Sequence, residues 1–147
     1  MLEAMQRWNP WRALRATSAE LWFADLGGDR GRWARGPDGD EILLDHGLDR
    51  RARREVLAHE LVHLERGVGW PQATALTMQL EEERVWRTAL LRLAPPAEVQ
   101  AFVRRRSSVG PIGVADLAEE FDLSLQAAAR LARLLGVLGV ELVGHDA

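Results

Sequence analysis

The chain contains no cysteine, no lysine and no tyrosine among its 147 residues. The absence of cysteine excludes disulfide bonds and thiolate metal sites, so histidines and carboxylates are the metal ligands that remain. No apolar run approaches the roughly 20 residues that a membrane-spanning helix requires. The first residues also lack the apolar segment of a secretory signal peptide, which predicts a cytoplasmic location.

Hydrophobic residues make up 47% of the chain, enough for a sizeable core in one domain with at most a small appendage. The net charge of −3 gives no general signal for nucleic-acid binding. The composition therefore gives no reason to expect a nucleic-acid partner.

The most informative motif is the run His59-Glu60-Leu61-Val62-His63. In a helix, two histidines four residues apart project from one face and can bind the same metal ion. The glutamate between them is placed to reach a metal-bound water, from which it can take a proton as a general base. This pattern is typical of a zinc hydrolase. The alternative is a pair of helical histidines with a solvated glutamate between them.

The residues around the motif favour a helix with defined ends. Asp49 is a candidate N-cap and Gly67 a candidate C-cap. One side of this helix carries an apolar stripe, and Val56 and Val62 flank the histidines on the other side. The stripe consists of Leu57, Leu61 and Leu64. Two apolar sides indicate that the histidines do not lie on an open surface.

A catalytic zinc ion needs a third protein ligand, and the downstream acidic run 81–83 offers candidates. Pro71 is expected to open this helical segment and Pro95 to follow its end. Glu82 falls within the apolar stripe of the segment, where a carboxylate costs several kcal/mol unless a cation compensates it. The stripe comprises Ala75, Met78, Val85, Trp86, Ala89 and Leu93. Glu82 is therefore the predicted ligand with Glu83 next, and an ion pair between Glu82 and an arginine is the alternative.

These motifs resemble the ImmA/IrrE family of metallopeptidases over roughly residues 8–95. The likeness rests on the segment 59–67 and on Glu82 with Trp86 four residues later. It implies Zn²⁺ as cofactor, with His59, His63 and Glu82 as ligands and Glu60 as the catalytic base. It also implies a regulatory protease whose substrate is a helix-turn-helix repressor. The chain departs from the family in two ways: Arg84 stands where asparagine or aspartate is common, and no tyrosine is present to stabilise an oxyanion.

The predicted fold class is α+β. Short strands are expected at residues 21–24, 32–34 and 41–45, separated by glycine-rich turns, and a helix at residues 2–16. The resemblance implies a small antiparallel sheet of about three strands on a helical, zincin-like core. The last strand is expected beside the active-site cleft, where it could pair with an extended substrate.

The C-terminal part changes character and predicts a helix-turn-helix-like hairpin. Val114, Leu117, Ala118 and Phe121 are spaced for one helix, and Ser124 is a candidate N-cap for a second at residues 126–135. The glycines at 136 and 139 suggest that a short strand follows. The predicted domains are therefore a metallopeptidase-like domain, 1–106, and a helical appendage, 107–147. Two alternative functions remain: an inactive zinc-binding regulator, and a DNA-binding regulator acting through the hairpin.

Overall fold

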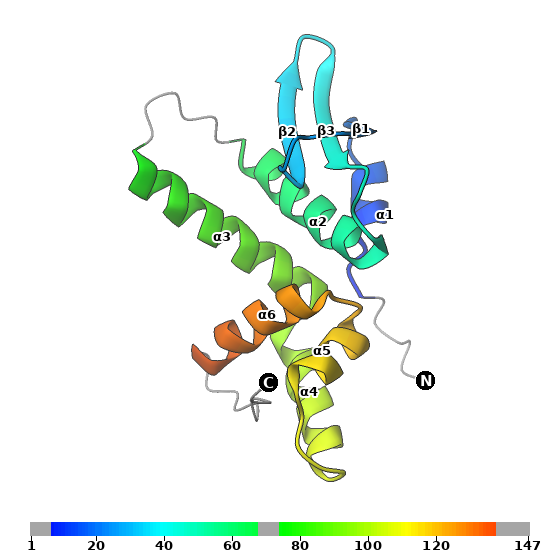
Figure 1. Ribbon diagram of the computed structural model, residues 1–147, viewed down its shortest axis with the longest axis vertical. Helices are drawn as coiled ribbons and strands as arrows, with labels where there is room; N and C mark the ends of the chain where they lie inside the picture. Colours follow the sequence, from blue (N-terminus) through cyan, green and yellow to red (C-terminus); the bar gives the residue numbers. More distant parts are fainter. Residues whose placement is uncertain (1–6, 68–73, 138–147) are drawn as a thin grey trace. The chain divides into compact units, whose positions relative to one another are not determined.

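The computed structural model describes residues 7–67 and 74–137. Within these residues the chain forms six helices and a three-stranded sheet, which confirms the α+β class (Figure 1). The chain divides into two compact units, residues 1–89 and 90–147, which are described separately below. This division does not test the predicted domain boundary after residue 106, which stays a prediction.

The first unit holds the sheet and the helix with the His-Glu-x-x-His motif. Its elements are α1 (Pro10–Arg15), β1 (Glu20–Ala24), β2 (Gly31–Gly36), β3 (Gly39–Asp45), α2 (Arg50–Arg66) and most of α3 (Ala75–Leu93). Residues 2–6 of the helix predicted at residues 2–16 lie outside the described residues. In the described part the helix begins at Pro10, where Asn9 caps it by accepting from the backbone N–H of Trp11 at 2.9 Å.

The three strands lie where the sequence predicted them, but their pairing is mixed. The order is β1-β3-β2, with β1 parallel and β2 antiparallel to β3. The expectation of a fully antiparallel sheet was therefore wrong. The expectation that the last strand could pair with a substrate was also wrong, because β3 is central and both of its edges are occupied by β1 and β2.

The core of the first unit joins the central strand to α2. Five buried side chains form it, and α1 contributes partly buried Trp11 and Leu14 at its margin. The five are Ile42, Leu44, Val56, Leu57 and Leu61. The leucines of the predicted stripe thus hold α2 against the sheet and α1. Burial of this face fixes which side of α2 carries the histidines.

The second unit is helical in the part that the structure describes. Beyond the end of α3 it contains α4 (Pro96–Ser107), α5 (Val114–Phe121) and α6 (Leu125–Val137). The predicted hairpin is present: the hydroxyl of Ser124 accepts from the backbone N–H of Ala127 at 3.1 Å, and Asp122 turns the chain in the left-handed conformation at φ 54°. The strand predicted after this hairpin lies outside the described residues.

Across residues 7–67 and 74–137, no helix is both long enough and apolar enough to span a membrane.

Candidate metal centre

The two histidines are set one turn apart on α2, whose ends the sequence predicted correctly. Asp49 caps the helix by accepting from the backbone N–H of Ala52 at 2.8 Å, and Gly67 ends it in the left-handed conformation at φ 62°. His59 is only 7% exposed, and the side chain of His63 is 19% exposed. The expectation that neither histidine lies on open surface is confirmed.

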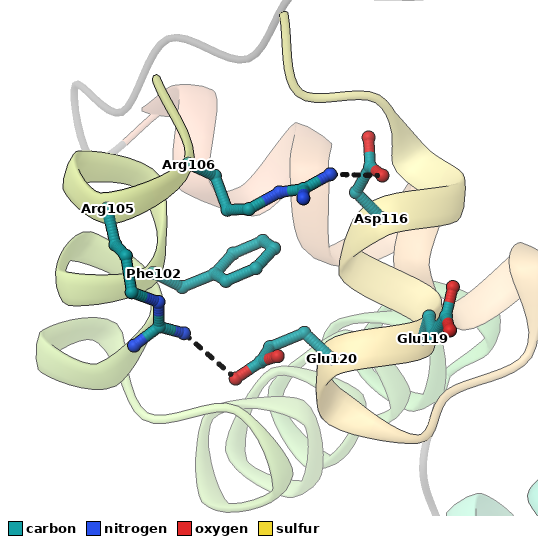
Figure 2. A pocket seen from close by; sticks show the side chains of 6 residues that line it. All are labelled: Phe102, Arg105, Arg106, Asp116, Glu119 and Glu120. Carbon is teal, nitrogen blue, oxygen red and sulfur yellow. Dashed lines mark hydrogen bonds and ion pairs between the residues drawn. The ribbon is translucent and has the colours of Figure 1, made fainter. Parts of the chain in front are cut away.

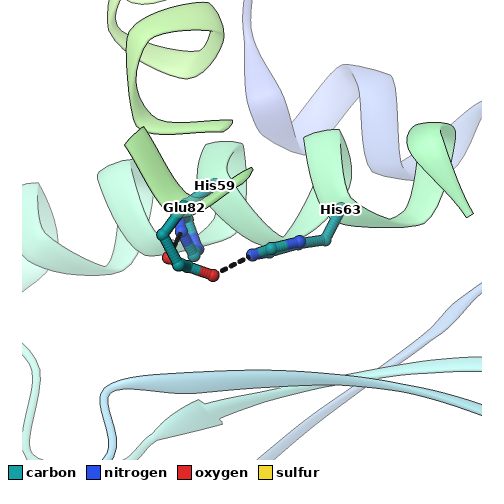
Figure 3. Close-up of side chains that lie close together, drawn as sticks. All are labelled: His59, His63 and Glu82. Carbon is teal, nitrogen blue, oxygen red and sulfur yellow. Dashed lines mark hydrogen bonds and ion pairs between the residues drawn. The ribbon is translucent and has the colours of Figure 1, made fainter. Parts of the chain in front are cut away.

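Glu82 reaches both histidines from α3. Its carboxylate oxygens lie 2.8 Å from Nε2 of His59 and 2.7 Å from Nε2 of His63. Figure 3 shows the three side chains converging from the two helices. The helix that carries Glu82 begins at Ala75, and the hydroxyl of Thr74 accepts from the backbone N–H of Thr77 at 3.2 Å. Pro71, predicted to open this segment, lies outside the described residues.

The choice of Glu82 among the three acids agrees with the geometry, but the reason given for it was wrong. The side chain of Glu82 is 48% exposed rather than buried in an apolar stripe. The first half of α3 is not covered, since Leu76, Met78 and Leu80 are 65%, 59% and 51% exposed. What singles out Glu82 is its position opposite the two histidines, which helical periodicity in one segment cannot supply.

The neighbouring acids have other surroundings. Glu81 forms an ion pair with Arg66 near the end of α2, and Glu83 is exposed. Neither Glu81 nor Glu83 belongs to the group in which one ligand atom from each of His59, His63 and Glu82 lies within 4.8 Å of the others.

These donors suit a divalent transition metal ion. Two imidazole nitrogens and one carboxylate oxygen, with no thiolate, form the kind of three-ligand set that leaves one coordination position open for water or substrate. The three residues form one group able to hold a metal ion. Whether they bind an ion, and which one, stays a prediction.

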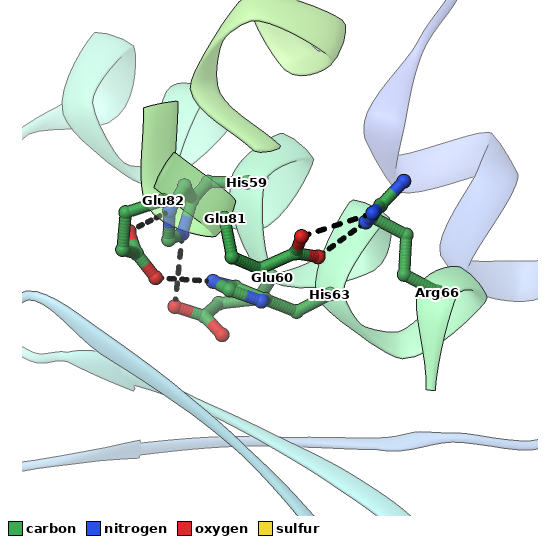
Figure 4. A network of polar contacts seen from close by, with 6 residues as sticks. All are labelled: His59, Glu60, His63, Arg66, Glu81 and Glu82. Carbon is green, nitrogen blue, oxygen red and sulfur yellow. Dashed lines mark hydrogen bonds and ion pairs between the residues drawn. The ribbon is translucent and has the colours of Figure 1, made fainter. Parts of the chain in front are cut away.

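Glu60 lies beside this group rather than within it. It is 5% exposed, and its Oε1 lies 3.2 Å from Nδ1 of His59. Figure 4 shows Glu60 on the sheet side of the histidines, while Glu82 approaches from α3. Glu60 thus faces Nδ1 of His59 and not Nε2, and it lies outside the group that could hold a metal ion.

Strand β2 approaches Glu60 closely at Gly31. A Cβ atom at this position would lie 3.2 Å from Oε1 of Glu60 and 2.5 Å from Cγ1 of Val56. Only glycine allows this approach, because a distance below 3.0 Å forces one of the two atoms to move. Gly31 was not among the predicted site residues, although a glycine in a strand is a known sign of close backbone approach.

The ionisation of the group follows from its contacts. Hydrogen bonds from His59 and His63 hold the pKa of Glu82 far below its ordinary value of 4.5. Burial lowers the pKa of His59, but hydrogen bonds to Glu60 and Glu82 outweigh this and raise it above 6.5. Both ring nitrogens of His59 face carboxylate oxygens, so both donate when the ring is charged. The surrounding carboxylates therefore favour a positive charge here, which a proton or a metal ion can supply.

Trp86 also contacts the metal-binding group. Its ring lies 4.3 Å from the ring of His59, centroid to centroid, with 33° between the planes. Trp86 follows Glu82 by one helical turn on α3, so the same face of this helix provides both a carboxylate and an aromatic ring that contact His59. Packing against Trp86 limits the rotation of the His59 ring and helps to aim Nε2 at Glu82.

The second unit contains a separate hollow of about 340 Å³ between α4 and α5 (Figure 2). Phe102 lines it together with charged side chains of both signs. Arg105 lies 3.4 Å from Glu120 and Arg106 lies 3.2 Å from Asp116. Because both arginines already pair with carboxylates, the hollow gives no indication of an anion-binding site.

The sequence matches no protein-family model and no curated protein. The resemblance to the ImmA/IrrE family therefore stays a prediction based on its motifs.

Proposed function

We propose that this protein is a zinc-dependent endopeptidase. The observation that carries the proposal is the convergence of His59, His63 and Glu82, with buried Glu60 on the same helix beside them. The ligand set has the composition of known catalytic zinc sites, two histidines and one glutamate. The choice of zinc over other divalent ions follows from these donor types and from the family resemblance.

A bound zinc ion would supply a Lewis acid that polarises a carbonyl group and makes water acidic enough to lose a proton near pH 7. His59 would bind it through Nε2, since Nδ1 faces Glu60. The Nδ1–H donates to Glu60 and thereby fixes the tautomer and orientation of the ring. Glu60 would thus support a ligand of the metal.

Glu60 is the proposed general base. One of its oxygens accepts from His59, which leaves the other for the attacking water. The water oxygen bonds to the peptide carbonyl carbon and Glu60 takes a water proton. Glu60 then gives this proton to the amide nitrogen as the C–N bond breaks, so that the amine leaves uncharged and the base is regenerated.

The substrate proposal rests on resemblance. A regulatory protease of this kind would cleave a helix-turn-helix repressor, and we propose a repressor encoded nearby, cut in the cytoplasm. Incubation with neighbouring repressors, with zinc or manganese present, followed by mass spectrometry would identify the fragments. If no repressor is cut, this substrate assignment fails.

Metal analysis of purified protein tests the centre itself. The wild type is expected to hold one zinc ion per chain and the His59→Ala variant to lose it. A zinc-binding regulator without activity would give the same metal result but cleave no peptide. A DNA-binding regulator with no metal centre would hold no stoichiometric zinc in either form.

A further inference from the structure

Arg66 and Glu81 form a two-point ion pair between α2 and α3. Arg66 donates through Nε to one oxygen of Glu81 and through Nη2 to the other, the latter at 2.9 Å. The side chains are 34% and 18% exposed, respectively. Figure 4 shows this pair next to the contact between His63 and Glu82. A paired guanidinium and carboxylate in this arrangement fixes relative orientation as well as distance.

The position of the pair connects it to the metal-binding group. Arg66 follows His63 by three residues, about one helical turn on α2. Glu81 directly precedes Glu82 on α3. The pair therefore joins the two helices at the level where Glu82 meets His63, and a rotation or shift of α3 that moved Glu82 would also break the pair.

The pair also compensates the charge of Glu81. Two consecutive carboxylates repel each other, and Glu81 would otherwise lie free next to a centre that attracts cations. Arg66 engages both oxygens of Glu81. Glu82 is thus left as the carboxylate that faces the histidines.

We propose that Arg66 and Glu81 are positioning residues that hold Glu82 in place as the third metal ligand. This inference rests on the proposed metal centre, and it adds two residues that do not touch the metal. Partners of this kind, which orient ligands without binding the ion, typically change metal affinity by about 10- to 100-fold when they are removed.

The test is a double-mutant cycle on zinc affinity, measured by competition with a chelating dye. Arg66→Gln and Glu81→Gln are each expected to raise the Kd about 10-fold, and the double variant by no more than either single one. The matched control is Arg106→Gln, which removes the Arg106–Asp116 pair at 3.2 Å in the second unit and should leave the Kd unchanged.

Opposite effects of the single variants would overturn the proposal. If the pair acted only through its charges, Arg66→Gln would tighten binding by removing a positive charge and Glu81→Gln would weaken it. A Kd equal to that of the wild type in both variants would overturn it as well. Arg66→Lys keeps the positive charge but cannot contact both oxygens of Glu81 in the same way, so its zinc affinity should lie between those of the wild type and Arg66→Gln. This variant also has a smaller risk of misfolding.

A metal-free measurement separates this inference from the proposed function. In ¹⁵N-histidine-labelled protein, the proton that His63 shares with Glu82 at 2.7 Å should give a downfield signal. We expect this signal in the wild type and its loss in Arg66→Gln. If the wild type binds no metal, the proposed function fails, while this signal still decides whether the pair positions Glu82. A signal unchanged in Arg66→Gln would overturn the inference even if the wild type binds zinc.

Discussion

Oε1 of Glu60 lies 3.2 Å from Nδ1 of His59, whose other ring nitrogen faces Glu82 at 2.8 Å. The ring of His59 therefore lies between two carboxylates with different surroundings. Glu60 is buried against strand β2, and Glu82 is half-exposed on α3. This asymmetry is the basis for proposing that a metal ion binds at Nε2 while Glu60 holds Nδ1.

The first prediction concerns the base. Glu60→Gln keeps the size of the side chain and an acceptor for His59, but it removes proton transfer. We expect zinc binding and folding to be retained and the rate of peptide cleavage to fall by roughly 10² or more. Zinc content and single-turnover cleavage would be measured together, with Glu65→Gln on the exposed side of α2 as control. Loss of zinc in Glu60→Gln would show that Glu60 is a ligand instead.

The second prediction separates the adjacent acids of α3. Glu82→Gln removes the anion that contacts both histidines, so zinc affinity should fall by about 10-fold or more. Glu83→Gln is the matched control and should change affinity little, because Glu83 is exposed. Isothermal titration with zinc would compare the two. The reverse result would place the third ligand one residue further along the helix.

The third prediction concerns the close approach of β2 to α2. In Gly31→Ala the new Cβ would meet Val56 and Glu60, and overpacking of this kind costs about 1–3 kcal/mol of stability. We also expect displacement of the Glu60 carboxylate, so that cleavage slows.

Gly36→Ala on the same strand is the control for this substitution. Its added Cβ would lie 3.4 Å from the carbonyl oxygen of Gly39, an approach that needs little or no movement. Urea unfolding and cleavage rates would be measured for both variants. If the two variants had the same unfolding free energy and the same cleavage rate, a specific role for Gly31 would be refuted.

The fourth prediction concerns pH in the metal-free protein. The pKa of Glu82 is lowered from 4.5, so its contribution to stability is present above pH 4.5 and is lost as pH falls through the folded pKa. The pKa of His59 is raised from 6.5, so its contribution is complete below pH 6.5 and is lost as pH rises through the folded pKa. Both contributions are present between these values, where the stabilising effect of the group on the Tm should be greatest.

Zinc should reverse the trend at the upper end of this window, because it replaces the proton on Nε2. The increase in Tm on adding zinc should therefore be larger at pH 7.5 than at pH 5.5. Calorimetry of the wild type and of His59→Ala, which should respond to zinc weakly at both values, would test this. An equal increase at both pH values in the wild type would contradict displacement of a proton by the metal.

Local sequence signals predicted the helices near the site with good accuracy. Asp49 and Gly67 defined the ends of α2 because capping depends on neighbouring residues alone. Ser124 likewise marked the start of α6. The strands were also placed correctly, since turn residues separate them. The pairing of the strands was not predicted correctly. Pairing depends on how segments distant in the sequence come together, and the alternation of side chains within one strand does not determine it.

The sequence by itself determined which metal-donor groups are present: the donor types, the spacing of His59 and His63 on one helical face, and a glutamate between them. Only the tertiary structure decided which acid meets the histidines, and that Gly31 confines Glu60 while Arg66 engages Glu81. The reason is physical. Helical periodicity fixes the direction of a side chain within its own segment, whereas its partners depend on how α2, α3 and the sheet pack together.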